Sequence, residues 1–177
     1  MNSNRFVLAA MVLGTALGSS QANAQCAGVN SCNTTNTASV TVGALVSLGM
    51  SSSTTALTAP TGAQVDAGAT IADAGPTFTV KANRSWTLNL KSLNATDWTY
   101  VGSDGGVKPI SHLTWADAVA GTFVAITASD AVMATGARTA GTAKAIFFQT
   151  AWTGGFGAAS NAPGVYSLPI QFTLSAP

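Results

Sequence analysis

Residues able to carry out acid–base or nucleophilic chemistry are few in this chain of 177 residues. His112 is the only histidine, and no nucleophile motif of the hydrolase type surrounds it. All six acidic residues are Asp, and most stand beside Gly or Ala in stretches typical of turns. Carboxylate catalysis requires two such groups held together, and no pair is indicated. We therefore predict that the protein is not an enzyme.

Ligands for a metal or a phosphate are also weakly indicated. Asp66 and Asp73 lie in VDAGATIADAG, but their spacing matches no established calcium loop, and turn chemistry accounts for them. The GGFG stretch at 154–157 lacks the Lys and the helix start of a phosphate-binding loop. The sequence predicts no cofactor and no metal.

Two cysteines, Cys26 and Cys32, stand close together in QCAGVNSCN. Their spacing is too wide for a CxxC redox site, and there are too few ligands for zinc. In an exported protein a disulfide between them would close a small loop, worth about 2 kcal/mol. A linkage to another chain is the alternative.

Aromatic side chains are the remaining candidates for ligand contact, because their rings stack on the apolar faces of sugars. Trp86, Trp98 and Tyr100 occupy strand-like positions and are predicted to belong to the core. Trp152 and Phe156 instead flank the Gly154-Gly155 turn, and loops carry function more often than cores do. This pair is the predicted contact for a glycan or a partner.

The N-terminus has the three parts of a secretory signal peptide. MNSNR supplies one positive charge, FVLAAMVLGTALG is too short to span a bilayer comfortably, and SSQANA offers small residues at Ala22 and Ala24. We expect a signal peptide over 1–24, a Cys-containing polar leader over 25–37 and a β domain over 38–177. The mature protein is expected to lack a transmembrane segment. It should be extracellular, at the cell surface or periplasmic.

Charge excludes some partners of the mature chain. Cleavage removes Arg5 from the seven basic residues and leaves six against six acidic ones. A neutral chain does not attract nucleic acid or anionic lipid by counterion release. Its Thr-, Ser- and Asn-rich exterior resists association weakly, which suits a protein that packs against something.

Strand-like alternation is clearest at the two ends of the predicted domain. In SVTVGALVSL, small or β-branched apolar residues alternate with polar ones from Ser39 to Leu48. In the closing GVYSLPIQFTLSAP every even position from Tyr166 to Leu174 is large and apolar, so a slip of one residue would expose all five. Pro169 places this last strand at a sheet edge or a bulge.

The stretches between these ends predict an all-β protein. TFTVKANRSWTLNLKS indicates two strands joined by a polar turn at Ala82-Asn83, and DWTYV, SHLTW, TFVAIT and KAIFFQTAW are further strand candidates. No segment keeps a helical period for twelve residues; ASDAVMATGARTAG comes nearest. We predict an antiparallel β-sandwich of Greek-key or pilin-like topology.

Two motifs resemble the WxL-type surface domains of Gram-positive bacteria. Trp86-Thr87-Leu88 is a literal W-x-L, and the closing strand carries Phe172-Thr173-Leu174 where that family has a second W-x-L near a C-terminal Pro. The resemblance implies a secreted β-sandwich attached non-covalently to cell-wall polysaccharide. A looser likeness to pilin-like and fimbrial subunits comes from the alternating strands at both ends.

Three functions therefore stay open. The first is a wall-associated or structural surface protein whose partners are wall polysaccharide or other surface proteins. The second is a pilin-like subunit that assembles with itself by β-strand addition, using its N-terminal strand. The third is a carbohydrate-binding module that uses Trp152 and Phe156.

Overall fold

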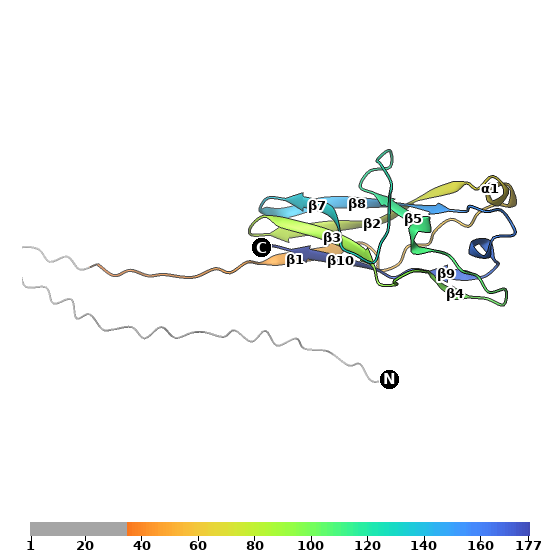
Figure 1. The fold of residues 1–177 in the computed structure, drawn as a ribbon. Coiled ribbons are helices and arrows are strands. Elements are labelled where there is room, and N and C mark those ends of the chain that lie inside the picture. The colour runs from red at the N-terminus through yellow and green to blue at the C-terminus, as the bar shows by residue number, and fades with distance from the viewer. Residues whose placement is uncertain (1–34) are drawn as a thin grey trace, which may run out of the picture. The chain divides into compact units, whose positions relative to one another are not determined.

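Antiparallel strands make up most of the regular structure in the computed structural model, which describes residues 35–177 (Figure 1). One sheet has five strands in the order β1-β2-β8-β5-β6. Their bounds are Val46–Met50, Thr70–Ala82, Thr139–Ala151, Leu113–Ala116 and Val124–Ala125. The predicted all-β antiparallel fold is confirmed.

The second sheet has three strands in the order β10-β3-β7, and a small sheet pairs β4 with β9. These strands cover Ile170–Ser175, Trp86–Ser92, Ala131–Gly136, Thr99–Val101 and Val165–Ser167. The helices are short: α1 spans Gly62–Asp66, and single 3₁₀ turns span Ile110–His112 and Ala159–Asn161. None of the described helices is long and apolar enough to cross a membrane.

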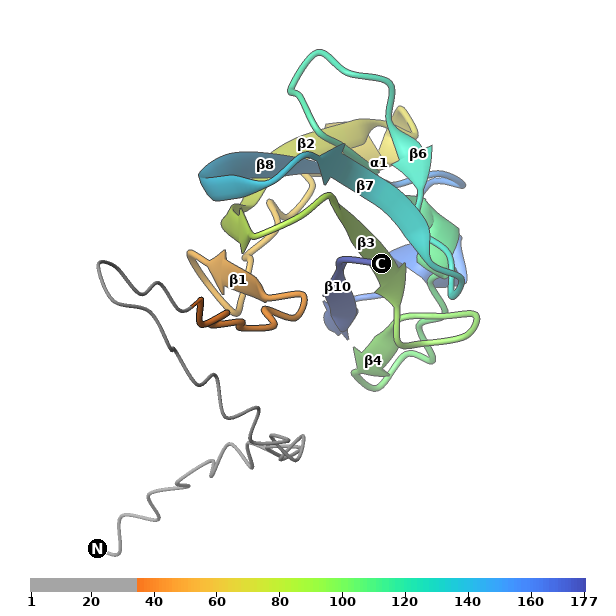
Figure 2. The ribbon, with the colours of Figure 1, turned by 90° about the vertical axis from the view of Figure 1, so that its left-hand side faces the viewer.

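The core lies between the two larger sheets, which pack face to face (Figure 2). Alternate residues of β2 and β3 point into it, because successive side chains of a strand face opposite sides. Phe78, Val80, Leu88 and Leu90 are each at most 1% exposed. The chain from Val42 to Pro177 forms one compact unit around this core.

The strands predicted on either side of Ala82-Asn83 are present, but they do not form a hairpin. β2 pairs with β1 and β8, whereas β3 pairs with β10 and β7. The turn therefore carries the chain from one sheet to the other. The alternation of both strands requires that one face of each strand is buried in the core. A hairpin within one sheet and a crossing from one sheet to the other both meet this requirement. The local pattern therefore does not distinguish these two arrangements.

Two elements differ from the sequence-based expectation. The segment nearest to a helical pattern contains β7, which pairs with β3 along Trp86–Leu90. The loop before β2 holds the one-turn helix α1, which is capped by Thr61 and Gln64 in a reciprocal capping box. The Thr–x–x–Gln spacing is a sequence signal for the start of a helix. The helix itself has five residues, too few to show a helical period of apolar residues.

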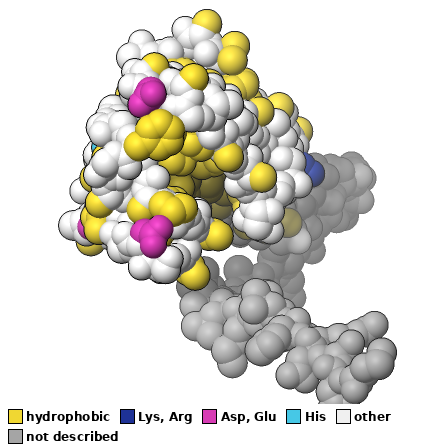
Figure 3. Space-filling model, turned by 90° about the vertical axis from the view of Figure 1, so that its right-hand side faces the viewer, with side chains coloured by type: hydrophobic (Ala, Val, Ile, Leu, Met, Phe, Trp, Pro, Cys, Tyr) yellow, Lys and Arg dark blue, Asp and Glu magenta, His cyan; other side chains and the backbone are white. Residues whose placement is uncertain are grey.

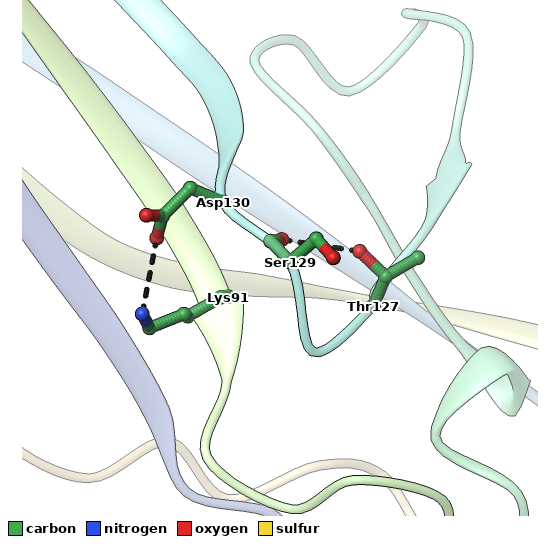
Figure 4. A network of polar contacts seen from close by, with 4 residues as sticks. All are labelled: Lys91, Thr127, Ser129 and Asp130. Carbon is green, nitrogen blue, oxygen red and sulfur yellow. Dashed lines mark hydrogen bonds and ion pairs between the residues drawn. The ribbon is translucent and has the colours of Figure 1, made fainter.

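An exposed ion pair joins β3 to the turn before β7 (Figure 4). Lys91 Nζ lies 3.5 Å from Asp130 Oδ1, and the Thr127 hydroxyl donates to the Ser129 carbonyl oxygen at 3.1 Å in the same turn. Because both charged groups contact solvent, the pair contributes at most about 1 kcal/mol. It links the two strands' ends at the surface.

Trp86, the first residue of the W-x-L motif, is a core residue held by its neighbours. It is 3% exposed, and its indole Nε1 donates to the Ala137 carbonyl oxygen at 2.9 Å. Its ring covers Gly136 on β7, where an added Cβ would lie 2.5 Å from ring atom Cζ2. A rigid ring cannot yield as a flexible side chain would.

We expect Gly136→Ala to destabilise the protein by about 1–3 kcal/mol, because the added methyl overpacks against Trp86. Gly141→Ala on β8 is the matched control: its nearest neighbour would lie 4.0 Å away, so its effect should stay within about 0.5 kcal/mol. Urea denaturation of both variants tests this. Equal stabilities would mean that the Trp86 ring moves freely.

Candidate interaction cleft

The two large sheets are not closed along one side. β1 ends one sheet and β10 ends the other, and the two strands lie next to each other (Figure 2). Among the described strands, none pairs with the outer edge of either one. Each edge therefore presents backbone N–H and C=O groups that can pair with another strand.

The last strand is less buried than its sequence requires. The single strand predicted from Tyr166 to Leu174 is divided in the structure: Tyr166 lies in β9, which pairs with β4, and β10 begins at Ile170. The five large apolar side chains of this stretch pack against the core, yet each is only half-buried: Tyr166, Leu168, Ile170, Phe172 and Leu174. Their neighbours on β3, Leu88 and Leu90, are fully buried. Pro169 lies just before β10, at the edge where it was predicted, and its carbonyl oxygen accepts from Leu93 N at 2.9 Å.

A cleft of about 860 Å³ continues from this open side towards the end of the domain that carries α1 and β9. Figure 3 shows that end hollowed and lined largely by apolar side chains. One wall is the segment from Ser52 to Pro60, and the other is the chain from Asn161 to Ile170. Phe148 and Leu113 form part of the lining between them.

Among the described residues, Lys108 is the one charged residue in the lining of this cleft. Backbone bonds fix its position: its carbonyl oxygen accepts from Trp98 N at 2.8 Å, and Val107 N donates to Ala159 O at 3.0 Å. The residue is 1% exposed. Its Nζ donates to the Ala151 carbonyl oxygen at 2.7 Å and lies 4.0 Å from the centre of the Trp152 ring.

Burial changes the titration of the groups around Lys108. It lowers the pKa of Lys108 to about 8, because an ammonium loses hydration in the cleft. It also lowers the pKa of His112, with a further contribution from the Lys108 charge. The pKa of Tyr166 is raised by burial and by Tyr100, against the bond that Tyr166 donates to Ala162 O.

Two more polar groups of the cleft lining are buried without a hydrogen-bond partner among residues 35–177. They are Thr150 Oγ1 on β8 and Trp152 Nε1 just after it. Thr150 is 2% exposed and follows Phe148 on the same face of β8. Buried polar groups of folded proteins normally have hydrogen-bond partners, so these two are exceptions.

One member of the predicted contact pair lines the cleft, and the other does not. Trp152 lies in the cleft with one ring face against the Lys108 ammonium. Phe156 is 69% exposed and lies beside the start of α1, where its ring approaches Gly62. A joint role of Trp152 and Phe156 in glycan binding stays a prediction.

The other residues considered in the sequence are placed as follows. Trp86, Trp98 and Trp115 are core residues, and Tyr100 is half-buried against Tyr166 with 5.0 Å between ring centres. Asp73 accepts from the Thr58 backbone and hydroxyl, whereas Asp66 is exposed in α1. The described part of the chain holds no cluster of metal-ligating side chains. Cys26, Cys32 and the signal peptide lie outside the described residues.

The cleft itself, and Lys108 within it, were not predicted. The only signal for the cleft was the even-numbered face of the last strand, which carries more apolar surface than the fold covers. Nothing in the sequence marks Lys108, which follows a Gly-rich turn at 105–106 as an ordinary surface lysine would.

Comparison with known proteins finds a likeness among solved structures only. No family model matches the chain, and no curated protein matches it. A solved structure of a chaperone–usher pilus contains a chain with a TM-score of 0.46 and 12% sequence identity. The match covers 85% of this chain and 99% of that one. The resemblance to WxL-type domains stays an expectation from the sequence.

Titration of Lys108 should be visible in the stability of the protein. Above pH 8 the native lysine has released its proton, whereas an unfolded lysine near its ordinary pKa of 10.5 still holds one. The unfolded state then binds more protons, so stability rises with pH. We expect the free energy of unfolding to rise by roughly 1–2 kcal/mol between pH 7.5 and 9.5, relative to Lys108→Met.

Urea denaturation at several pH values in this range gives the comparison. His112 titrates below the window and Tyr166 above it, because their pKa values are shifted down and up. Parallel curves for wild type and Lys108→Met would show that the native lysine keeps its ordinary pKa.

Proposed function

We propose that the protein is a structural subunit of the cell exterior that assembles with itself. A β-strand from the N-terminal segment of one copy enters the open side of the next copy, between β1 and β10. The observation that carries this proposal is the half-buried inner face of β10 beside two unpaired strand edges. An added strand covers the apolar face and pairs with the backbone at the same time.

The N-terminal segment has the properties that such a strand needs. Residues 35–45 form no regular secondary structure, and Val40 and Val42 are 87% and 68% exposed. These two valines are two residues apart, so in an extended chain they share one face while Thr41 faces the other way. No charged residue occurs from Gln25 to Leu45, so insertion into an apolar cleft would bury no ion.

The length of the segment is also sufficient. At about 3.3 Å per residue, β9 and β10 together extend over about 36 Å from Val165 to Ser175. Residues 25–41 can reach about 56 Å when extended. The segment that precedes β1 can therefore cover the whole inner face of the last two strands.

A second copy is a better source for this strand than the same copy. To fold back beside β1, the chain would have to reverse within residues 43–45. Those residues are already held, because Asn83 Nδ2 donates to Gly43 O at 2.8 Å and Leu45 N donates to Asn83 Oδ1 at 2.8 Å. Exchange between copies needs no reversal there, and head-to-tail exchange produces an open fibre.

We expect residues 25–177 to assemble into polymers, and Val40→Asp to reduce assembly at least about 100-fold. The substitution would place an unpaired carboxylate in the apolar cleft of the neighbour. It leaves the donor copy's own fold unchanged, since Val40 is 87% exposed and lies outside every strand. Sedimentation and electron microscopy of the purified protein measure the outcome.

Thr41→Asp is the matched control, because it adds the same charge one residue away on the opposite face of the strand. It should assemble like wild type. Equal loss in both variants would remove the strand model, and a wild type that stays monomeric at high concentration would remove self-assembly altogether. Pelleting only in the presence of isolated cell wall would instead support the wall-associated function.

A further inference from the structure

The cleft has two chemically different parts. Met50, Ile170 and Phe172 supply apolar surface to the lining, beside Ser and Thr residues of the segment from Ser52 to Thr58. Towards its other end Lys108, Thr150 and Trp152 bring three polar groups into the lining. These groups come from β8 and from the loop after β4, and backbone bonds fix both.

Each of the three polar groups has unused hydrogen-bonding capacity. An ammonium carries three donors, and one described acceptor, Ala151 O, takes a bond from Lys108 Nζ. Trp152 Nε1 is a donor and Thr150 Oγ1 is a donor and acceptor, and neither has a partner within the described chain. The set offers donors in excess, so the group that complements it is an oxygen acceptor.

Resting on the function proposed above, we propose that this end of the cleft is a hydrogen-bonding subsite for the inserted strand. Because Lys108 Nζ lies over the face of the Trp152 ring and the indole N–H lies in the ring plane, Lys108 Nζ and Trp152 Nε1 each donate to a separate oxygen of that strand, and Thr150 completes the set. The N-terminal segment contains no acidic residue, so these oxygens are neutral: backbone carbonyls or Asn or Thr side chains.

The subsite supplies something that the apolar part of the cleft lacks. Alternation on the inserted strand excludes a slip of one residue, because that would turn its valines outward. A slip of two residues keeps the valines inward and changes the apolar contacts little. A fixed group of donors distinguishes these registers, because a misplaced strand leaves them buried and unpaired.

The four tryptophans provide the readout. Trp86 and Trp98 already donate from Nε1 to Ala137 O and Pro109 O. Trp115 Nε1 is buried without a described partner, as Trp152 Nε1 is, but Trp115 is not part of the cleft lining. The experiment uses a protein of residues 25–177 that carries Val40→Asp, a substitution that blocks self-insertion. The ligand is a synthetic peptide of residues 35–45.

In a ¹H–¹⁵N spectrum, the peptide should move the indole resonance of Trp152 downfield as Nε1 gains an acceptor, with Trp115 and Trp86 unchanged. Trp152→Phe and Lys108→Met in the same protein should each weaken peptide binding about tenfold. The peptide with Val40→Asp is the control for specific insertion. If the role of Lys108 is merely structural, Lys108→Met will bind the peptide as tightly as the protein that keeps Lys108.

The two proposals fail in different ways. A peptide that binds without moving the Trp152 resonance, and with equal affinity for Lys108→Met and Trp152→Phe, overturns the subsite and leaves strand insertion intact. A peptide that does not bind to the protein, while the four indole resonances show a folded core, overturns strand insertion itself.

Discussion

The inner face of the last strand is the constraint on which the functional features depend. Strand β10 carries large apolar residues at alternate positions, so it cannot rotate or slip without exposing them. Among the described strands, β10 pairs with β3 on one edge, and β1 beside it pairs with β2. The sandwich buries Leu88 and Leu90 completely and leaves Phe172 and Leu174 half-buried.

Close packing surrounds parts of the cleft. An added Cβ on Gly75, in the bulge of β2, would lie 2.7 Å from Ile146 and Phe148, so that strand lies tightly on β8. On the wall from Asn161 to Ile170, Tyr166 contacts Tyr100 with tilted rings, and the backbone at Gly164 lies against the Tyr100 ring. Such preformed contacts reduce the ordering cost of binding.

Alternation predicted most of the strands, including the whole face of β10, because a period of two is read directly from residues such as Phe172 and Leu174. It did not predict which strands pair: β2 and β3 are adjacent in sequence but lie in different sheets. It also overextended the first strand, since Val40 and Val42 alternate well yet precede β1. The burial of Lys108 arises from contacts 43 residues away and has no local signal.

An apolar cleft alone does not fix the register of a strand inserted into it, and the polar groups at the end of this cleft supply that selection. Burying Val40 and Val42 contributes roughly 1.5–3 kcal/mol each, a gain that depends little on where along the groove they lie. Lys108, in contrast, loses hydration in the free subunit, as its lowered pKa shows, and regains hydrogen bonds only when an oxygen stands at one position. The free subunit is thereby less stable than one with an apolar residue there. Polar groups of this kind lower the stability of the free subunit and favour one register of the inserted strand. In a fibre, an error of register between two subunits would misplace every subunit beyond them.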